Sequence, residues 1–434
     1  PWLATRLCVA ELDYAGHCQS VRVLAGQAAD ESLQQPCFDD LGRLLVLSDR
    51  QGFWQPWRED QTGQLQALAC AAADHAAAPW QLGARNYLPL ADGHLLLSWW
   101  EAGFAVLAES GAAAVQPLAR EYSRFRQVAA DAEYFYLIAG AVDGLSAVLA
   151  IDRRSQRCQV LAGGERLLPV AQVSRPQALR FATSDGETCH GFFYPPHNPA
   201  CRGPVASKPP LLVFVHGGPT SACYPTFDPR IQFWTQRGFA VADLNYRGSS
   251  NFGRAYRLRL QGAWGEVEVA DAEALVGHLS EQGWIDPARA FIRGASAGGF
   301  TTLCALAFGR MFAGGASLYG VSDPLSLRRS THKFEGDYLD WLLGDPQQHA
   351  ERYQARTPLL HSERIVAPLI FFQGGLDAVV LPAQTERMVA ALRSRGVAVE
   401  YHCYADERHG FRQAAHLAHA LEAELGFYRQ LLSS

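Results

Sequence analysis

One serine sits between close-packing glycines where an apolar strand gives way to a helix, in the stretch Phe291–Phe300 (Phe-Ile-Arg-Gly-Ala-Ser-Ala-Gly-Gly-Phe). This pattern, G-x-S-x-G, is typical of a nucleophile elbow, in which a serine is exposed on a sharp strand-to-helix turn. A side chain at Gly294 or Gly298 would collide with the neighbouring backbone, so the glycines have a steric purpose. The following helix would direct the positive end of its dipole at Ser296. The bare motif also arises by chance in a chain with 39 glycines, so its interpretation depends on the surrounding pattern.

From Leu211 onwards the chain alternates apolar strands with amphipathic helices, which indicates a mostly parallel sheet. This region is preceded by a hairpin over 179–195 that turns at Asp185-Gly186 and by a Pro-rich loop over 195–210. The expected strands lie at 211–215, 239–244, 290–293, 313–319, 368–372 and 397–404, and the expected helices at about 230–237, 266–282, 299–309, 383–395 and 412–431. The pattern predicts an α/β-hydrolase fold, a mostly parallel doubly wound sheet, over residues 176–434.

A serine hydroxyl is a weak nucleophile that needs a base, and the base needs an acid to hold its tautomer. Asp377 follows the apolar strand at 368–372, and His409 lies in a Gly-flanked loop before the final helix. The chain order Ser296, Asp377, His409 is the order of α/β-hydrolases. The nearby competitors are less well placed, because one falls within a strand and two on the final helix: His402, His416 and His419.

The first strand of the parallel sheet ends in His216-Gly217-Gly218-Pro219. Acyl transfer develops a negative oxygen that needs two preorganised donors, commonly the N–H after the nucleophile and one from a loop at a strand end. The N–H groups of Gly218 and Ala297 are therefore the predicted oxyanion hole. A simple turn at Gly217-Gly218 is the alternative.

Residues 1–175 contain a repeat of β type. Three segments beginning at Asp40, Asp92 and Asp131 each read as a turn, an apolar strand, a Gly-containing turn and a second strand. Their spacings of 52 and 39 residues bracket the length of a four-stranded propeller blade. We predict a partial β-propeller of about three and a half blades, with an unrelated β-sandwich as the alternative.

The two ends of this region also resemble each other. The segment 7–13 is similar to 147–152, and each precedes a Val-Leu-Ala-Gly sequence. The chain is therefore expected to begin inside a blade and to be a piece of a larger propeller. Four tryptophans here could form a ligand platform, but we expect them to be blade core: Trp54, Trp57, Trp99 and Trp100.

Composition excludes several function classes. A formal net charge of -5 gives no basic footprint, so nucleic acid is not an expected partner. The ten cysteines form no C-x-x-C pair, which argues against zinc and a disulfide framework and favours a reducing compartment, the cytoplasm. No run approaches the ~20 apolar residues of a membrane helix, so no membrane partner is expected. The first residue is Pro1, which leaves a removed leader open, and a homo-oligomer stays open too.

Residues 179–434 resemble the catalytic domain of the prolyl oligopeptidase family of serine peptidases, in the branch of acylaminoacyl peptidases and dipeptidyl aminopeptidases. The repeat region is similar to the family's N-terminal propeller, which normally has seven blades and restricts access to short peptides. The matching stretches are His216-Gly217-Gly218-Pro219, Asn245-Tyr246-Arg247-Gly248-Ser249, Trp264-Gly265 with Asp271, Arg293–Gly299, Gln373-Gly374 with Asp377, Val380 and Pro382, and His409-Gly410-Phe411.

The resemblance implies that Ser296 is the nucleophile, His409 the general base and then acid, and Asp377 the orienting carboxylate. Gly218 and Ala297 would supply the oxyanion N–H groups. In other branches a tyrosine contributes there, and its position here is that of His216. The expected enzyme cleaves short peptides through an acyl-enzyme with no metal or organic cofactor.

Two other functions stay open, because the same triad hydrolyses esters and because a propeller can serve as a binding module. A carboxylesterase and a catalytically inactive propeller-based binding protein are these alternatives. The hydrophobic substrate pocket is expected to draw on the loop after Tyr319 and on the insert 331–343. The sequence does not define the preferred residue at the scissile bond, or whether cleavage is internal or from an end.

Overall fold

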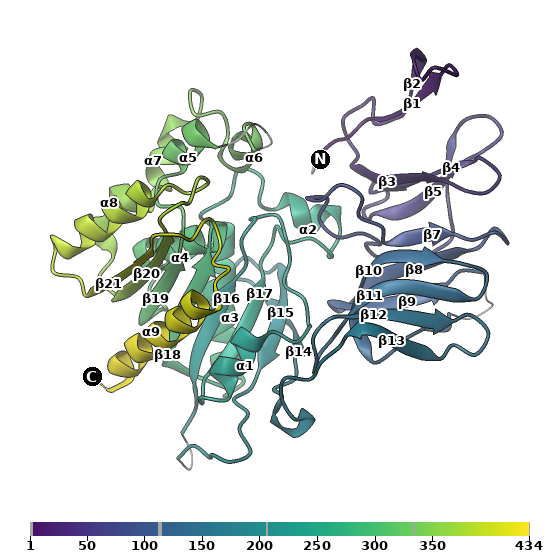
Figure 1. Ribbon diagram of the computed structural model, residues 1–434. Coiled ribbons are helices and arrows are strands. Elements are labelled where there is room, and N and C mark those ends of the chain that lie inside the picture. Colours follow the sequence, from purple (N-terminus) through teal and green to yellow (C-terminus); the bar gives the residue numbers. More distant parts are fainter. Residues whose placement is uncertain (1–2, 112–114, 205–206, 332, 334, 434) are drawn as a thin grey trace. The chain divides into compact units, whose positions relative to one another are not determined.

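The computed structural model describes residues 3–111, 115–204, 207–331, 333 and 335–433, so residues 332 and 334 of the expected pocket insert and 205–206 of the Pro-rich loop lie outside the described residues. The chain divides into two compact units (Figure 1). Unit 1 comprises Pro1–Val170, Tyr224–Phe227 and Ser250–Leu258, and unit 2 comprises Ala171–Cys223, Asp228–Ser249 and Arg259–Ser434. Among the described residues, no helix is long and apolar enough to cross a membrane.

Unit 2 is built on an eight-stranded sheet with the order β14-β15-β17-β16-β18-β19-β20-β21. The first two strands pair antiparallel, β15 pairs antiparallel with β17, and the remaining pairs are parallel. The strands are β14 Gln177–Ala182, β15 Thr188–Tyr194, β16 Pro210–Val215, β17 Ala240–Asn245, β18 Asp286–Ala295, β19 Gly314–Leu318, β20 Leu369–Gly374 and β21 Val399–Tyr404. The predicted mostly parallel sheet is confirmed, and it has the form of an α/β-hydrolase fold.

Helices cover both faces of this sheet (Figure 1). On one face α1 and α9 pack together, with the rings of Trp234 and Tyr428 5.7 Å apart. The helices of unit 2 are α1 Pro229–Thr235, α3 Val267–Glu281, α4 Ala297–Phe308, α5 Pro324–Ser330, α6 Tyr338–Leu343, α7 Ala350–Ala355, α8 Pro382–Arg393 and α9 Ala414–Ser433, with 3₁₀ turns at Val170–Gln172 and Pro358–Arg364. The five predicted helices are present, whereas α5, α6 and α7 were not predicted.

Unit 1 consists of small separate antiparallel sheets, and no sheet among its described residues closes on itself. The sheets are β1-β2, β3-β4-β5-β6, β7-β8-β9 and β10-β11-β12-β13. Their strands are β1 Leu7–Leu12, β2 Cys18–Ala25, β3 Leu33–Phe38, β4 Leu44–Ser48, β5 Gln55–Glu59, β6 Leu65–Ala67, β7 Tyr87–Pro89, β8 Leu95–Glu101, β9 Phe104–Glu109, β10 Tyr122–Ala130, β11 Tyr134–Ala141, β12 Ala147–Asp152 and β13 Cys158–Gly163.

The sequence repeat matches this division into sheets. The three repeated segments form β4, β8 and β11, each the second strand of its sheet. The self-similar ends of the region form the pairs β1-β2 and β12-β13. The four tryptophans are at most 7% exposed, so their interpretation as core residues is correct: Trp54, Trp57, Trp99 and Trp100.

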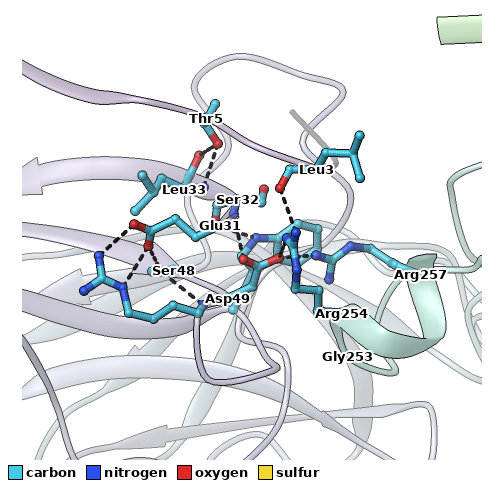
Figure 2. A network of polar contacts seen from close by, with 12 residues as sticks. Leu3, Thr5, Glu31, Ser32, Leu33, Ser48, Asp49, Gly253, Arg254 and Arg257 are labelled. Carbon is cyan, nitrogen blue, oxygen red and sulfur yellow. Dashed lines mark hydrogen bonds and ion pairs between the residues drawn. The ribbon is translucent and has the colours of Figure 1, made fainter. Parts of the chain in front are cut away.

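A buried network of polar contacts in unit 1 surrounds Asp49 (Figure 2). One carboxylate oxygen of Asp49 accepts the N–H of Ser32 at 2.6 Å, and the other accepts from Arg254 at 2.8 Å and from Arg257. Both arginines lie on the short helix α2, Arg254–Leu258. The guanidinium of Arg257 also stacks on Trp54, 3.6 Å from the ring centroid. These contacts explain why residues 250–258, which the sequence pattern assigned to the hydrolase region, belong to unit 1.

Candidate active site

Ser296 occupies the tight turn between β18 and α4. Its φ is 55° and its ψ is −119°, a conformation that residues with a side chain rarely adopt. A Cβ on Gly294 would lie 2.3 Å from the carbonyl carbon of Gly298, and a Cβ on Gly298 would lie 2.2 Å from the oxygen of Val215. The two glycines therefore allow the backbone contacts that the sequence pattern predicted for an elbow.

His409 joins Ser296 to Asp377 by two hydrogen bonds. Its Nε2 lies 2.9 Å from Ser296 Oγ, and its Nδ1 lies 2.8 Å from Asp377 Oδ2. Because a carboxylate only accepts, Nδ1 carries the proton, and Nε2 is left to accept from the serine hydroxyl. The structure thus brings together the three residues that the sequence singled out.

Asp377 is fixed from several sides. Its Oδ1 accepts the backbone N–H groups of Val379 and Val380 at 2.8 and 2.9 Å. The amide of Gln373 donates to Oδ2 at 3.3 Å. The carboxylate is buried, at 3% exposure, so its orientation toward His409 does not depend on solvent. A charged group in such a place needs these donors.

The competing histidines are used elsewhere. His419 contacts the hydroxyl of Tyr404 at 2.8 Å, and His416 contacts Glu407 at 3.0 Å. His402 lies in β21 and stacks on Phe372, with the rings 5.3 Å apart. None of these three contacts is with Ser296.

Gly218 and Ala297 line the same cavity as Ser296 and His409. This is the placement expected of oxyanion donors, although the roles of their N–H groups stay a prediction. His216, which the resemblance placed at the position of a tyrosine, has its Nε2 2.8 Å from Ser249 Oγ and its Nδ1 2.9 Å from Gly217 O. Burial lowers the pKa of His216 to about 4, so this imidazole is neutral at pH 7.

The cavity beside Ser296 has a volume of about 210 Å³. Its wall is mostly apolar, as in many substrate pockets. The residues lining it besides those named above are Pro219, Trp264, Val321, Leu327, Thr331, Glu335, Tyr338, Leu339, Leu342, Val379 and Val380. The described part of the insert 331–343 and the loop after Tyr319 both contribute, as the sequence suggested.

A buried carboxyl lies behind one wall of this cavity. Trp264 packs on Phe300 with the ring centroids 4.0 Å apart. The next residue, Gly265, donates its N–H to Glu268 Oε1 at 2.7 Å, whereas Oε2 has no hydrogen-bond partner among the described residues. Burial raises the pKa of Glu268 to about 7, and the nearby Asp271 acts in the same direction. The turn that carries Trp264 is therefore attached to a group whose charge changes near neutral pH.

The sequence did not single out the individual roles of two aromatic residues near the site, Tyr338 and Tyr319. Tyr338 forms part of the cavity wall and contacts Thr220 Oγ1 at 2.5 Å, yet nothing near it shows a helical period. Tyr319 packs its ring against His409, with the centroids 4.9 Å apart. The sequence pattern placed Tyr319 at the end of the expected strand 313–319, whereas β19 ends at Leu318, so Tyr319 lies at a strand end, where functional side chains gather in open α/β sheets.

The fold and these contacts define an α/β-hydrolase in which a serine, a histidine and an aspartate are joined by hydrogen bonds in that order. Residues 225–434 match the model of the Prolyl oligopeptidase family. This matched segment carries Ser296, Asp377 and His409.

Among curated relatives, dipeptidyl peptidase family member 6 of Caenorhabditis elegans is 31% identical over 210 residues, which are 47% of this chain and 28% of the relative. Dipeptidyl aminopeptidase BIII of Pseudoxanthomonas mexicana is 29% identical over 54% of this chain and 35% of the relative. The chain thus spans about a third of the length of these relatives.

Two solved structures match nearly the whole chain. A puromycin hydrolase is 34% identical with a TM-score of 0.95 and is matched over 100% of this chain and 66% of its own. A puromycin-hydrolyzing peptidase of Mycobacterium tuberculosis is 37% identical with a TM-score of 0.94, over 99% of this chain and 66% of its own. The likeness therefore extends over both units and leaves about a third of each relative unmatched.

Proposed function

We propose that this chain is a serine-type peptidase that hydrolyses short peptides through an acyl-enzyme. The observation that carries the proposal is the uninterrupted line from Ser296 Oγ through both nitrogens of His409 to Asp377. The match of residues 225–434 to the model of the Prolyl oligopeptidase family supports it.

In the first half-reaction Ser296 Oγ attacks the scissile carbonyl carbon, and its proton passes to His409 Nε2. Asp377 stabilises the imidazolium and keeps Nδ1 protonated throughout. The carbonyl oxygen takes up negative charge, and the N–H groups of Gly218 and Ala297 stabilise it. His409 then gives the proton to the departing amine, and the C–N bond breaks.

In the second half-reaction water attacks the ester on Ser296. His409 accepts one proton from that water, and the second tetrahedral intermediate collapses to the acid. The same proton returns to Ser296 Oγ, so the enzyme leaves the cycle unchanged. The peptide has gained one water, and no step involves a metal or an organic cofactor.

The cavity wall supports a preference for an apolar residue before the scissile bond. Trp264, Val321 and Leu342 present apolar surface within a space of about 210 Å³. Burying a phenylalanyl rather than an alanyl side chain there is worth about 1.5 to 3 kcal/mol. We expect kcat/KM for a phenylalanyl amide to exceed that for the alanyl amide by about 10- to 100-fold. Puromycin is a second probe, because the two solved structures reported above are a puromycin hydrolase and a puromycin-hydrolyzing peptidase.

We further propose that the small sheets of unit 1 are blades of a partial β-propeller, as the repeat and its match to successive sheets suggest. The domains are then 1–175 and 176–434, apart from the two later segments of unit 1. Such a domain would restrict the substrate to short peptides. A cytoplasmic location and the oligomeric state stay predictions.

The test is intact-mass analysis after treatment with a fluorophosphonate, followed by peptide assays. We expect one adduct on the natural chain, none on Ser296→Ala and far slower labelling of His409→Ala. Matched amides and esters are then compared by kcat/KM. No adduct on a folded chain would contradict the proposal and favour a binding protein, and turnover of esters without amides would identify a carboxylesterase.

A further inference from the structure

Tyr319 adopts a backbone conformation that suits glycine. It directly follows β19, and its φ is 39°. Among the described residues of unit 2, the non-glycine residues with positive φ are Tyr319 and the elbow serine, Ser296. A bulky residue in this region is strained, and such strain gathers at functional sites.

The surrounding backbone explains the turn but not the tyrosine. The carbonyl of Leu318 accepts the N–H of Ser296 at 3.0 Å, and Tyr319 donates its own N–H to Phe372 O at 2.6 Å. Immediately afterwards Gly320 passes so close to α4 that a Cβ on Gly299 would lie 2.5 Å from Gly320 Cα. Glycine at position 319 would make the same turn without strain, so the aromatic side chain must have a separate use.

The ring of Tyr319 packs against the imidazole of His409. The two centroids are 4.9 Å apart and the ring planes meet at 64°. The ring of Tyr319 also packs against Phe411, with the ring centroids 5.2 Å apart and the ring planes at 79°. Gly410, which lies between His409 and Phe411 in the chain, has a φ of 91°. The loop that carries His409 therefore turns beside the imidazole, and packing must hold this turn in place.

We propose that Tyr319 is a positioning residue that keeps His409 Nε2 directed at Ser296 Oγ. This inference rests on the proposed function, because it gives the ring a task only if His409 acts as the base. The edge-to-face contact restricts rotation of the imidazole, and the hydrogen bond from Nδ1 to Asp377 supplies the second restraint. Two restraints on different sides fix a ring more tightly than one, and proton transfer depends on that geometry.

Substrate binding should be little affected by the ring. Among the described residues that line the substrate cavity, Tyr319 does not occur. Loss of the ring is therefore expected to lower kcat and leave KM nearly unchanged. A misplacement of about 1 Å near the reacting atoms can cost on the order of 100-fold, so we expect a fall in kcat of about 10- to 100-fold.

The experiment compares Tyr319→Gly and Tyr319→Phe in the full chain. Glycine removes both the ring and the backbone strain, whereas phenylalanine keeps both and loses the hydroxyl. Rates on a phenylalanyl anilide are divided by the concentration of active sites, titrated with a fluorophosphonate. Gln156→Gly is the matched control, because Gln156 is exposed, lies in unit 1 and also has a positive φ, of 59°.

The expected result is a lower kcat with unchanged KM for Tyr319→Gly, near-complete recovery in Tyr319→Phe, and normal rates for Gln156→Gly. If Tyr319→Gly does not fold, Tyr319→Leu replaces it, because leucine keeps apolar bulk without a ring. Normal kcat per titrated site in the ring-less variant would overturn the inference. A Tyr319→Phe variant as slow as Tyr319→Gly would overturn it as well. If the natural chain itself does not react with the fluorophosphonate, the proposed function fails instead.

Discussion

Replacing Glu268 with glutamine should change how the stability of the chain depends on pH. The variant should gain free energy of unfolding over the natural protein as the pH rises from acidic to alkaline. Glu268 is fully buried, at 0% exposure. Its Oε1 accepts from Gly265 N–H at 2.7 Å and from Thr301 Oγ1 at 3.3 Å, and its Oε2 has no hydrogen-bond partner in the part of the chain that the structure describes. Glutamine has the same shape, so it can keep the accepting oxygen while removing the charge.

Proton linkage makes the natural chain less stable as the pH rises. Burial raises the pKa of Glu268 from 4.5 to about 7. Between these two values the folded state holds a proton that the unfolded state has released, so the free energy of unfolding falls as pH rises. Above the pKa of Glu268 in the folded state, the natural chain has lost all of the free energy of unfolding that the bound proton contributes. Each pH unit between the two pKa values corresponds to about 1.4 kcal/mol, so the loss at pH 8 is about 3 kcal/mol.

The measurement is urea unfolding at pH 5 and pH 8, with the natural chain and Glu268→Gln side by side. The difference in free energy of unfolding between the two proteins should change by about 2.5 kcal/mol in favour of the variant from pH 5 to pH 8, because pH 5 already lies above the unfolded pKa of 4.5. Asp243 is also buried, with a pKa raised to about 7, but it is present in both proteins and cancels. Glu281→Gln, at an exposed position of the same helix, is the control. Equal pH dependence of the natural chain and Glu268→Gln would refute the reasoning.

Three further predictions concern the site and unit 1. Asp377→Asn should lower kcat by about 10⁴-fold with little effect on folding, because the wrong His tautomer results, and steady-state rates on a peptide anilide will measure it. Gly298→Ala should abolish fluorophosphonate labelling, since its Cβ would lie 2.2 Å from Val215 O; labelling at the natural rate would contradict the steric argument. Arg257→Met should destabilise unit 1 by about 3 kcal/mol, because it removes one partner of the buried Asp49; an unchanged thermal transition would show that Arg254 alone suffices.

The elements that were predictable carry strong local signals. Ser296 and Asp377 follow strand ends, and His409 precedes a long helix. The strands of the parallel sheet are continuous apolar runs. Their hydrophobic pattern reflects burial on both faces of the sheet, which is a property of the sequence itself. Ser296, Asp377 and His409 could therefore be selected without a structure.

The elements that were missed depend on distant partners. Helices α2, α5, α6 and α7 have five to seven residues each, too short to show an apolar period or to be stable alone. Residues 250–258 belong to unit 1 because Asp49, far away in the sequence, attracts Arg254 and Arg257. Such an association has no local signature.

The glycines at the elbow show why a motif gives less than the site it marks. The sequence reveals that Gly298 and Gly299 are small, but not which backbone each one meets. Gly298 meets the end of β16, at Val215 O, and Gly299 meets Gly320 just past β19. Helix α4 is thereby held against the strand that leads to Gly218 and against the strand that leads to Tyr319. The nucleophile, the proposed oxyanion donor and the residue that packs on His409 therefore share one set of backbone contacts. A Cβ added to either glycine should shift all three together, which is why their effects on catalysis are not expected to add independently.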